Sequence, residues 1–209
     1  MKIAQRLLIL LMVLPFLGVL LTGCLKKIPE PAFQETKIVP DPIQQFLGAF
    51  SIAESLEAKA SIRIDTVRNG EKLSFALNGD LLYQKPNHLR LMGYHPFGMG
   101  IFDALFKNGS FFLLIPIQKK AYEGEVREIE GMADRAGPIQ IATEKDEVNG
   151  IPRRIQIELL EKETRIDLRL KDARINFPLP EDSFQWIVPE GVEVRPLTRL
   201  SRSKELKIK

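Results

Sequence analysis

Apolar and polar residues alternate with a period of two along much of the chain from Ala58 onward. In the run ASIRIDTV, Ile62 and Ile64 alternate with Arg63 and Asp65, which is the pattern of a strand with one buried face. Similar runs are separated by turn residues, among them Asn-Gly pairs, which strongly favour hairpins. At least six strands joined by short turns predict an antiparallel meander with one apolar and one wet face. The runs cover 58–67, 72–84, 88–94, 110–117, 151–160 and 164–177, with turns at 68–71, 85–87, 108–109, 149–150 and 161–163.

A helical spacing of apolar residues precedes the first strand. Asp41-Pro42 is a typical helix start, and the helix is expected to end near Leu56, where the pattern changes. A second helix is a candidate at 125–136. The four residues that form the apolar face of the first helix are Ile43, Phe46, Leu47 and Phe50.

These elements together predict an α+β fold that is mainly antiparallel β. The expected architecture is an unclosed, curved β half-barrel with one or two helices lidding an apolar concave face. Such an arrangement easily leaves a hollow between sheet and helix. Periodicity does not decide whether side chains or a ligand fill that hollow.

The first 24 residues have the organisation of a secreted lipoprotein. A basic start is followed by the uncharged stretch 7–21, which is shorter than the roughly 20 residues of a spanning helix and fits a signal peptide. The stretch ends in Leu21-Thr22-Gly23-Cys24, which resembles the lipobox of bacterial lipoproteins. The resemblance implies that residues 1–23 are removed and that Cys24 carries a diacylglycerol and an N-acyl chain. An uncleaved membrane anchor with an incidental cysteine is the alternative.

This interpretation of the N-terminus predicts where the protein is located and where its folded domain begins and ends. Leu25, rather than an Asp retention signal, favours the outer membrane with the protein facing the periplasm. Residues 24–41 are rich in proline and predict an extended tether before a domain at 42–197. The basic tail 198–209 either touches an anionic membrane surface or is solvated.

Charge and cysteine content exclude some classes of function. The net charge of +3 includes Lys2 and Arg6, so the processed chain has 28 basic and 27 acidic residues and shows no sign of nucleic-acid binding. A single cysteine excludes an internal disulfide and any multi-cysteine metal site. His88 and His95 have no clear third metal ligand, and no dinucleotide fingerprint, P-loop or Gly-x-Ser-x-Gly motif occurs. We therefore expect neither a metal, nor a cofactor beyond the covalent lipid, nor an enzyme activity.

An apolar, glycine-rich segment lies between Tyr94 and Phe106. Gly93, Gly98 and Gly100 indicate a loop or bulge within it. An exposed apolar loop of this kind would have to meet a partner, a ligand or a membrane, whereas in the alternative Phe97 and Met99 fold into the core. The loop residues singled out for membrane or cargo contact are Phe97, Met99, Ile101 and Phe102.

Residues 43–197 resemble the LolA/LolB lipoprotein-localisation superfamily. The turn Lys85-Pro86 with Leu89-Arg90, the run His95-Pro96-Phe97-Gly98, and the ending with Phe184 and Pro189-x-Gly191-Val192 carry the resemblance. It is closest to the outer-membrane receptor LolB, itself a lipoprotein. The resemblance implies an eleven-stranded, unclosed barrel that holds acyl chains on its concave face and receives lipoproteins from a soluble periplasmic carrier. Segment 124–139 is short for the family's lid and leaves the size of the cavity open.

The sequence thus predicts a membrane-anchored periplasmic lipoprotein that binds acyl chains of lipoproteins or lipids and helps transfer them to the outer membrane. Alternatives are an assembly lipoprotein that binds a protein partner, or a sensor of mislocalised lipoproteins. The oligomeric state stays open. For each candidate cavity residue, plain core packing is an alternative to lipid contact; these residues are Ile62, Ile64, Phe75, Leu77, Leu89, Leu91, Phe111 and Leu113.

Overall fold

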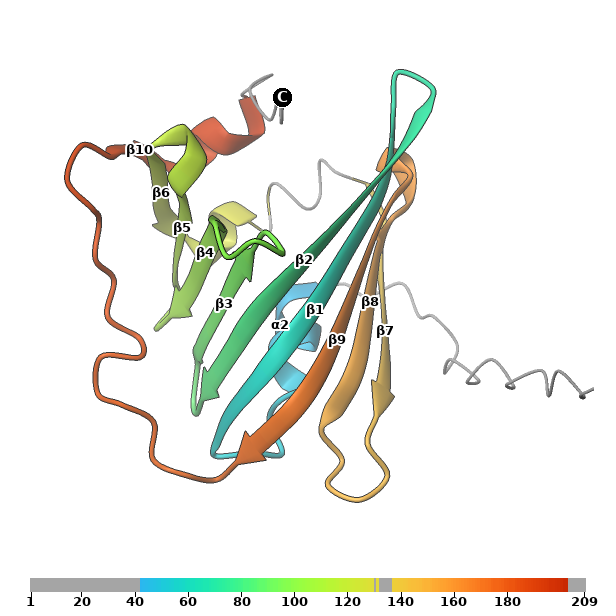
Figure 1. Ribbon diagram of the computed structural model, residues 1–209, viewed down its shortest axis with the longest axis vertical. Coiled ribbons are helices and arrows are strands. Elements are labelled where there is room, and N and C mark those ends of the chain that lie inside the picture. Colours follow the sequence, from blue (N-terminus) through green and yellow to red (C-terminus); the bar gives the residue numbers. More distant parts are fainter. Residues whose placement is uncertain (1–41, 130, 132–136, 203–209) are drawn as a thin grey trace, which may run out of the picture. The chain divides into compact units, whose positions relative to one another are not determined.

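The computed structural model describes residues 42–129, 131 and 137–202, which belong to the second of two compact units of the chain, 33–209. These residues form one ten-stranded sheet (Figure 1). Residues 126–129 add a short helical segment after β6. The elements in chain order are α2 (Pro42–Gly48), β1 (Ser55–Arg68), β2 (Glu71–Gln84), β3 (His88–Tyr94), β4 (Gly100–Lys107), β5 (Ser110–Ile115), η1 (Pro116–Gln118), β6 (Lys120–Glu125), β7 (Ile139–Lys145), β8 (Pro152–Leu159), η2 (Leu160–Lys162), β9 (Thr164–Ile175), β10 (Glu193–Pro196) and η3 (Leu197–Arg202).

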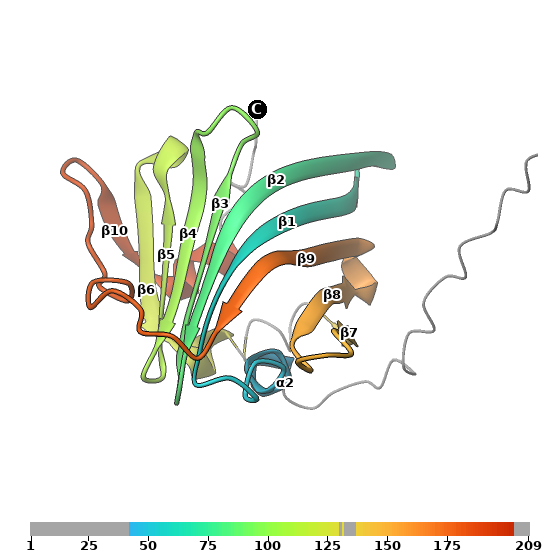
Figure 2. The same ribbon diagram turned by 60° about the horizontal axis from the view of Figure 1, so that its bottom comes forward.

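The sheet is an open antiparallel meander, which confirms the predicted fold class. Its strand order is β10-β6-β5-β4-β3-β2-β1-β9-β8-β7, and every neighbouring pair is antiparallel except β6 and β10. The strands β7 and β10 lie at opposite edges and do not pair, so the sheet curls without closing (Figure 2). The resemblance implied eleven strands, whereas the described residues form ten.

Two of the hairpin turns, β1–β2 and β4–β5, form at Asn-Gly pairs of the sequence. Asn69 and Gly70 have φ of 53° and 80°, and Asn108 and Gly109 have φ of 50° and 79°. Two successive residues with positive φ match the twist of antiparallel strands, and Asn and Gly reach this region at the lowest cost. The glycine-rich segment also behaves as predicted, because the β3–β4 register shifts at Gly93 and residues 95–99 form a loop.

The first helix covers part of the concave face of the sheet and is shorter than predicted. It ends at Gly48, and Leu56, its expected end, is instead the second residue of β1, opposite Tyr83 of β2. The strand starts early because the β1–β2 ladder satisfies the backbone hydrogen bonds of residues 55–58. Phe50 lies in the turn after the helix, yet it is buried and its ring packs near that of Tyr83.

The second predicted helix is only partly visible. Residues 126–129 are helical, while most of the remaining residues of 125–136 lie outside the described part of the chain. Val126 is buried in the main core. The main core gathers residues of α2, of the turn after it and of the concave side of β1, β2, β3, β4, β7, β8 and β9.

Residues 177–192, which we call the strap, connect β9 to β10 (Figure 1). The strap lies against the convex face of the sheet, opposite the face that α2 covers. Arg90 Nη1 on β3 donates to the carbonyl oxygen of Ser183 at 2.9 Å, and Lys107 Nζ on β4 donates to that of Phe184 at 3.3 Å. Trp186 packs near Phe112 and donates from Nε1 to a carboxylate of β6 at 2.8 Å. The strap therefore closes the back of the β3–β6 half of the sheet.

Candidate functional site

The concave face carries a row of four apolar side chains that the helix leaves half-covered. Ile157 on β8, Ile166 on β9, Ile64 on β1 and Phe75 on β2 lie directly opposite one another across three strand pairs. All four are half-buried. We call these residues the apolar row.

The apolar row begins where coverage by α2 ends. On β1, the concave-side residues Leu56, Ala58, Ala60 and Ile62 are buried, and Ile64 is the first that is not. The same change occurs on β9 between Leu168 and Ile166, and on β8 between Ile155 and Ile157. Figure 1 shows the reason, since the strands extend well past the short helix.

The eight candidate cavity residues share the concave face. Strand register pairs Ile62 with Leu77 and Ile64 with Phe75, so their side chains point to the same side. Leu89 pairs with Phe106, which in turn pairs with Phe111. Six of the eight belong to the main core or pack against it: Ile62 and Leu89 are buried, and Ile64, Leu77, Leu91 and Phe111 are half-buried.

The other two candidate cavity residues lie outside the main core cluster. Leu113 packs against a smaller cluster of Ile115, Tyr122 and Leu197. Phe75 is half-buried and extends the apolar row toward the β2 side. The structure therefore brings all eight to one surface, on which only Ile62 and Leu89 are fully buried.

The four candidate loop residues separate into two pairs. Phe97 and Met99 are 93% and 53% exposed, so they do not fold into the core. Ile101 and Phe102 belong to β4 and are half-buried, and Phe102 packs against the main core. The loop itself is held by two backbone hydrogen bonds, from His95 N to the Met99 oxygen at 2.8 Å and from Gly98 N to the His95 oxygen at 2.7 Å.

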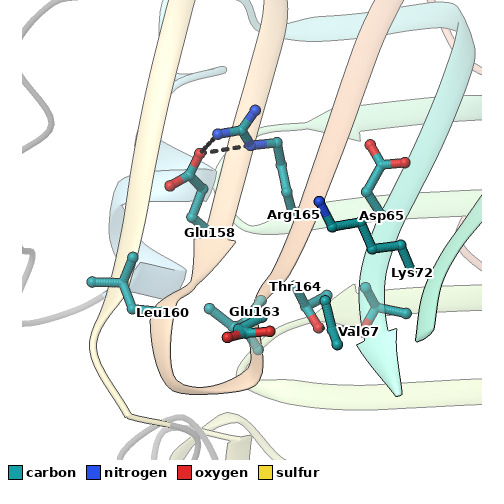
Figure 3. A pocket seen from close by; sticks show the side chains of 10 residues that line it. Asp65, Val67, Lys72, Glu158, Leu160, Glu163, Thr164 and Arg165 are labelled. Atoms are coloured by element: carbon teal, nitrogen blue, oxygen red, sulfur yellow. Dashed lines mark hydrogen bonds and ion pairs between the residues drawn. The ribbon is translucent and has the colours of Figure 1, made fainter. Parts of the chain in front are cut away.

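A separate hollow of about 310 Å³ lies at the ends of β1, β2, β8 and β9 (Figure 3). Arg165 pairs with Glu158 within it at 2.6 Å, and the hydroxyls of Thr66 and Thr164 are hydrogen-bonded at 2.7 Å. Hydrogen bonds from Ser74 and Arg63 lower the pKa of Asp65 at its rim. Seven of the ten lining residues are charged or carry a hydroxyl, and no candidate cavity residue is among the ten. This hollow is therefore distinct from the predicted acyl cavity.

His88 is the first residue of β3, and His95 is the first residue of the loop 95–99. His88 Nε2 lies 3.1 Å from Asn108 Oδ1 and its ring packs near Phe184, while His95 belongs to the exposed loop. Among the described residues, no three His, Cys, Asp or Glu side chains gather as a metal ion would require. The same residues include no helix with the length and apolarity to cross a membrane.

Sequence reasoning missed the strap and its anchor, Arg90. Arg90 binds Asp103 through two hydrogen bonds, Nε to Oδ1 at 3.0 Å and Nη2 to Oδ2 at 2.7 Å. The hydrogen bond to Asp103 raises the pKa of Arg90 despite the opposing effect of burial. Only the resemblance marked Arg90 beforehand, as part of a turn motif. Cys24, the tether 24–41 and residues 203–209 lie outside the described residues.

Comparisons with known proteins give similarity to solved structures only. No family model matches the chain, and no curated protein matches its sequence. A LolA superfamily protein from Nitrosomonas europaea is 10% identical, with a TM-score of 0.42 over 66% of this chain and 96% of its own. A DUF1329 family protein from Desulfovibrio piger is also 10% identical, with a TM-score of 0.43 over 69% and 98%. A candidate outer membrane lipoprotein-sorting protein domain from Vibrio parahaemolyticus is 9% identical, with a TM-score of 0.35 over 68% and 94%.

Proposed function

We propose that this chain is a membrane-anchored periplasmic lipoprotein that binds acyl chains of lipoproteins or lipids on its concave face and helps transfer them to the outer membrane. The observation that carries the proposal is the apolar row, a continuous line of apolar side chains that the helix leaves half-covered. The lipobox at Cys24 and the resemblance to the LolA/LolB superfamily supply the location and the kind of cargo.

Burial of hydrocarbon is sufficient to drive binding. Each acyl CH₂ fully removed from water is worth about 0.8 kcal/mol, so ten methylenes along the apolar row would gain at most about 8 kcal/mol before the entropic cost of ordering the chain. Transfer then requires only that the next site hold the chain more tightly. Neither a nucleotide nor a catalytic residue is needed in such a transfer.

The exposed loop provides a contact point for delivery. We propose that Phe97 and Met99 touch the membrane or the incoming cargo, because an ordered loop that presents two exposed apolar side chains gains free energy only when something covers them. Cys24 would keep this loop close to the membrane through its lipid.

A charge placed within the apolar row tests the proposal. Phe75→Glu puts a carboxylate where acyl chains would lie, and we expect the affinity for a fluorescent fatty acid to fall at least about tenfold, since desolvating a charge costs more than 1.4 kcal/mol. Ala76→Glu is the matched control, because Ala76 pairs with Arg63 and points to the opposite, wet face of the same strand.

The binding of the fluorescent fatty acid to the two variants decides whether the apolar row is an acyl site. Loss of binding in Phe75→Glu alone, with an unchanged circular dichroism spectrum in both variants, supports the acyl site. Equal binding in both variants, or no binding by the wild-type chain, would contradict it. In the second case an assembly lipoprotein with a protein partner becomes the better reading.

A further inference from the structure

A second exposed turn lies beside the Phe97 loop. The loop 95–99 joins β3 to β4 and the turn 116–119 joins β5 to β6, so in an antiparallel sheet both lie at the same end of the strands. They adjoin one another, since a Cβ added to Gly100 would lie 3.7 Å from Pro116 Cγ. We call 95–99 and 116–119 the two apolar turns; Figure 2 shows both at one end of the β3–β6 half of the sheet.

Each of the two apolar turns presents an apolar side chain to solvent. Ile117 is 65% exposed, beside Phe97 at 93% and Met99 at 53%. Backbone hydrogen bonds hold both turns, with Lys119 N donating to the Pro116 oxygen at 2.9 Å in the second. Ordered turns that keep such side chains in water forgo roughly 1.5–3 kcal/mol of burial for each one.

The two apolar turns carry positive charge and no negative charge. Neither turn contains an acidic residue, and the second ends in the exposed Lys119, followed by Lys120 at the start of β6. Glu193 comes near, because its backbone N–H donates to the Lys119 oxygen at 2.9 Å. Both oxygens of its carboxylate, however, accept hydrogen bonds from Arg195, one from Nε and one from Nη2, each at 2.8 Å. The two turns thus combine apolar tips with positive charge.

We propose that the two apolar turns form a docking surface for an anionic lipid bilayer, with Ile117 as a second inserting residue and Lys119 contacting lipid phosphates. A stable protein interface buries at least about 1,200 Å² over a continuous surface, whereas three side chains on two narrow turns offer far less. Apolar tips flanked by lysine instead match the interface of an anionic membrane. Ile117 would add a second inserting side chain to the membrane contact proposed for Phe97. The inference rests on the proposed function only in that it takes the protein to be anchored at a membrane.

The proposed anchor lies within reach of such a docked position. Residues 25–41 separate Cys24 from α2. At about 3.3–3.6 Å per residue, these 17 residues can extend to roughly 55–60 Å. This reach exceeds the length of the 14-residue strand β1, about 46 Å at 3.3 Å per residue, so a lipid on Cys24 allows the two apolar turns to rest on the same membrane.

The experiment uses the lipidated full chain in vesicles and exploits its single cysteine. A lipidated Cys24 has no thiol, so Ile117→Cys or Phe97→Cys gives one site for an environment-sensitive fluorophore. Val148→Cys is the matched control: it is 95% exposed in the β7–β8 loop, at the opposite end of the sheet. In phosphatidylglycerol vesicles we expect a blue shift and quenching by bilayer-embedded quenchers at 97 and 117, and none at 148.

The lysine is tested in the labelled Ile117→Cys chain. Adding Lys119→Gln should lower the ratio of inserted to solvated probe about fivefold in phosphatidylglycerol, since one lysine near an anionic surface is worth about 1 kcal/mol. In phosphatidylcholine it should change nothing. An equal effect in both lipids would overturn the assignment of Lys119.

The remaining outcomes separate this inference from the proposed function. Insertion at 97 without insertion at 117 refutes the two-turn surface and leaves the single-loop contact standing. Insertion at neither position refutes both membrane contacts, while acyl binding is judged by the Phe75 titration alone. A wild-type chain that reacts with the thiol reagent would refute lipidation at Cys24; the same probes would then be measured in a Cys24→Ser background on phosphatidylglycerol vesicles.

Discussion

Replacing Arg90 with methionine removes the guanidinium that ties the strap to the sheet. The side chains of Arg90 and Asp103 are only 18% and 17% exposed, and two hydrogen bonds of 3.0 and 2.7 Å join them. A third, of 2.9 Å, reaches the Ser183 carbonyl. Breaking a buried pair by removing one partner typically costs 3–5 kcal/mol. Since some solvent reaches this pair, we expect a loss of about 3 kcal/mol in the free energy of unfolding.

The single tryptophan makes this loss visible. Trp186 lies in the strap, so its fluorescence reports strap release, whereas far-ultraviolet circular dichroism reports the sheet. With a urea m-value of about 2 kcal/mol per molar, 3 kcal/mol lowers the midpoint by about 1.5 M. In Arg90→Met the fluorescence transition should come first, because the strap loses its anchor before the sheet melts.

A double variant checks the reasoning. Arg90→Met with Asp103→Leu leaves no unpaired charge beside the buried Leu105 and Leu114, so it should recover much of the lost stability. If the double variant is as unstable as the sum of the two single variants, the two side chains do not act as a pair. If Arg90→Met shifts neither transition, the strap does not depend on Arg90.

Two further predictions concern the sheet. At Asp167 burial raises the pKa, but hydrogen bonds from Arg154 and Arg169 more than offset this effect, so the pKa is lowered in the folded state. The free energy of unfolding should therefore fall as the pH drops below about 4. Asp167→Asn should flatten that pH dependence, which urea titrations at several pH values would measure. A Cβ at Gly93 would lie 2.3 Å from the Phe102 ring, so Gly93→Ala should destabilise by about 1–3 kcal/mol in urea, whereas Gly48→Ala, whose Cβ meets nothing within 4 Å, should not.

The strands and turns could be predicted because local chemistry determines them. Period-two alternation sets the face of each strand, and Asn69-Gly70 and Asn108-Gly109 take the positive φ of tight hairpins. The first helix was predicted too long because the prediction rested on the same local periodicity. Phe50 has the helical spacing of a core residue, but it reaches the core from a turn, and periodicity alone does not distinguish the two.

The candidate site was predictable only in part. The side of the sheet to which Ile64 and Phe75 point follows from phase, but their half-covered state depends on the length of α2. The strap has no periodic pattern, and its contacts join residues far apart in sequence, such as Arg90 and Ser183. Ile117 was missed because its run, SFFLLIPI, reads as one strand, although Pro116 ends the strand and exposes the next residue.

Photo-crosslinking from the apolar row tests the central claim most directly. A benzophenone amino acid in place of Phe75, in the full chain in cells, should form adducts with acyl lipid or lipoprotein when irradiated. The same amino acid in place of Ala76, on the wet face of β2, should form none. Lipid adducts at position 75 alone would support the concave face as the acyl site, and equal adducts at both positions, or none at 75, would contradict it.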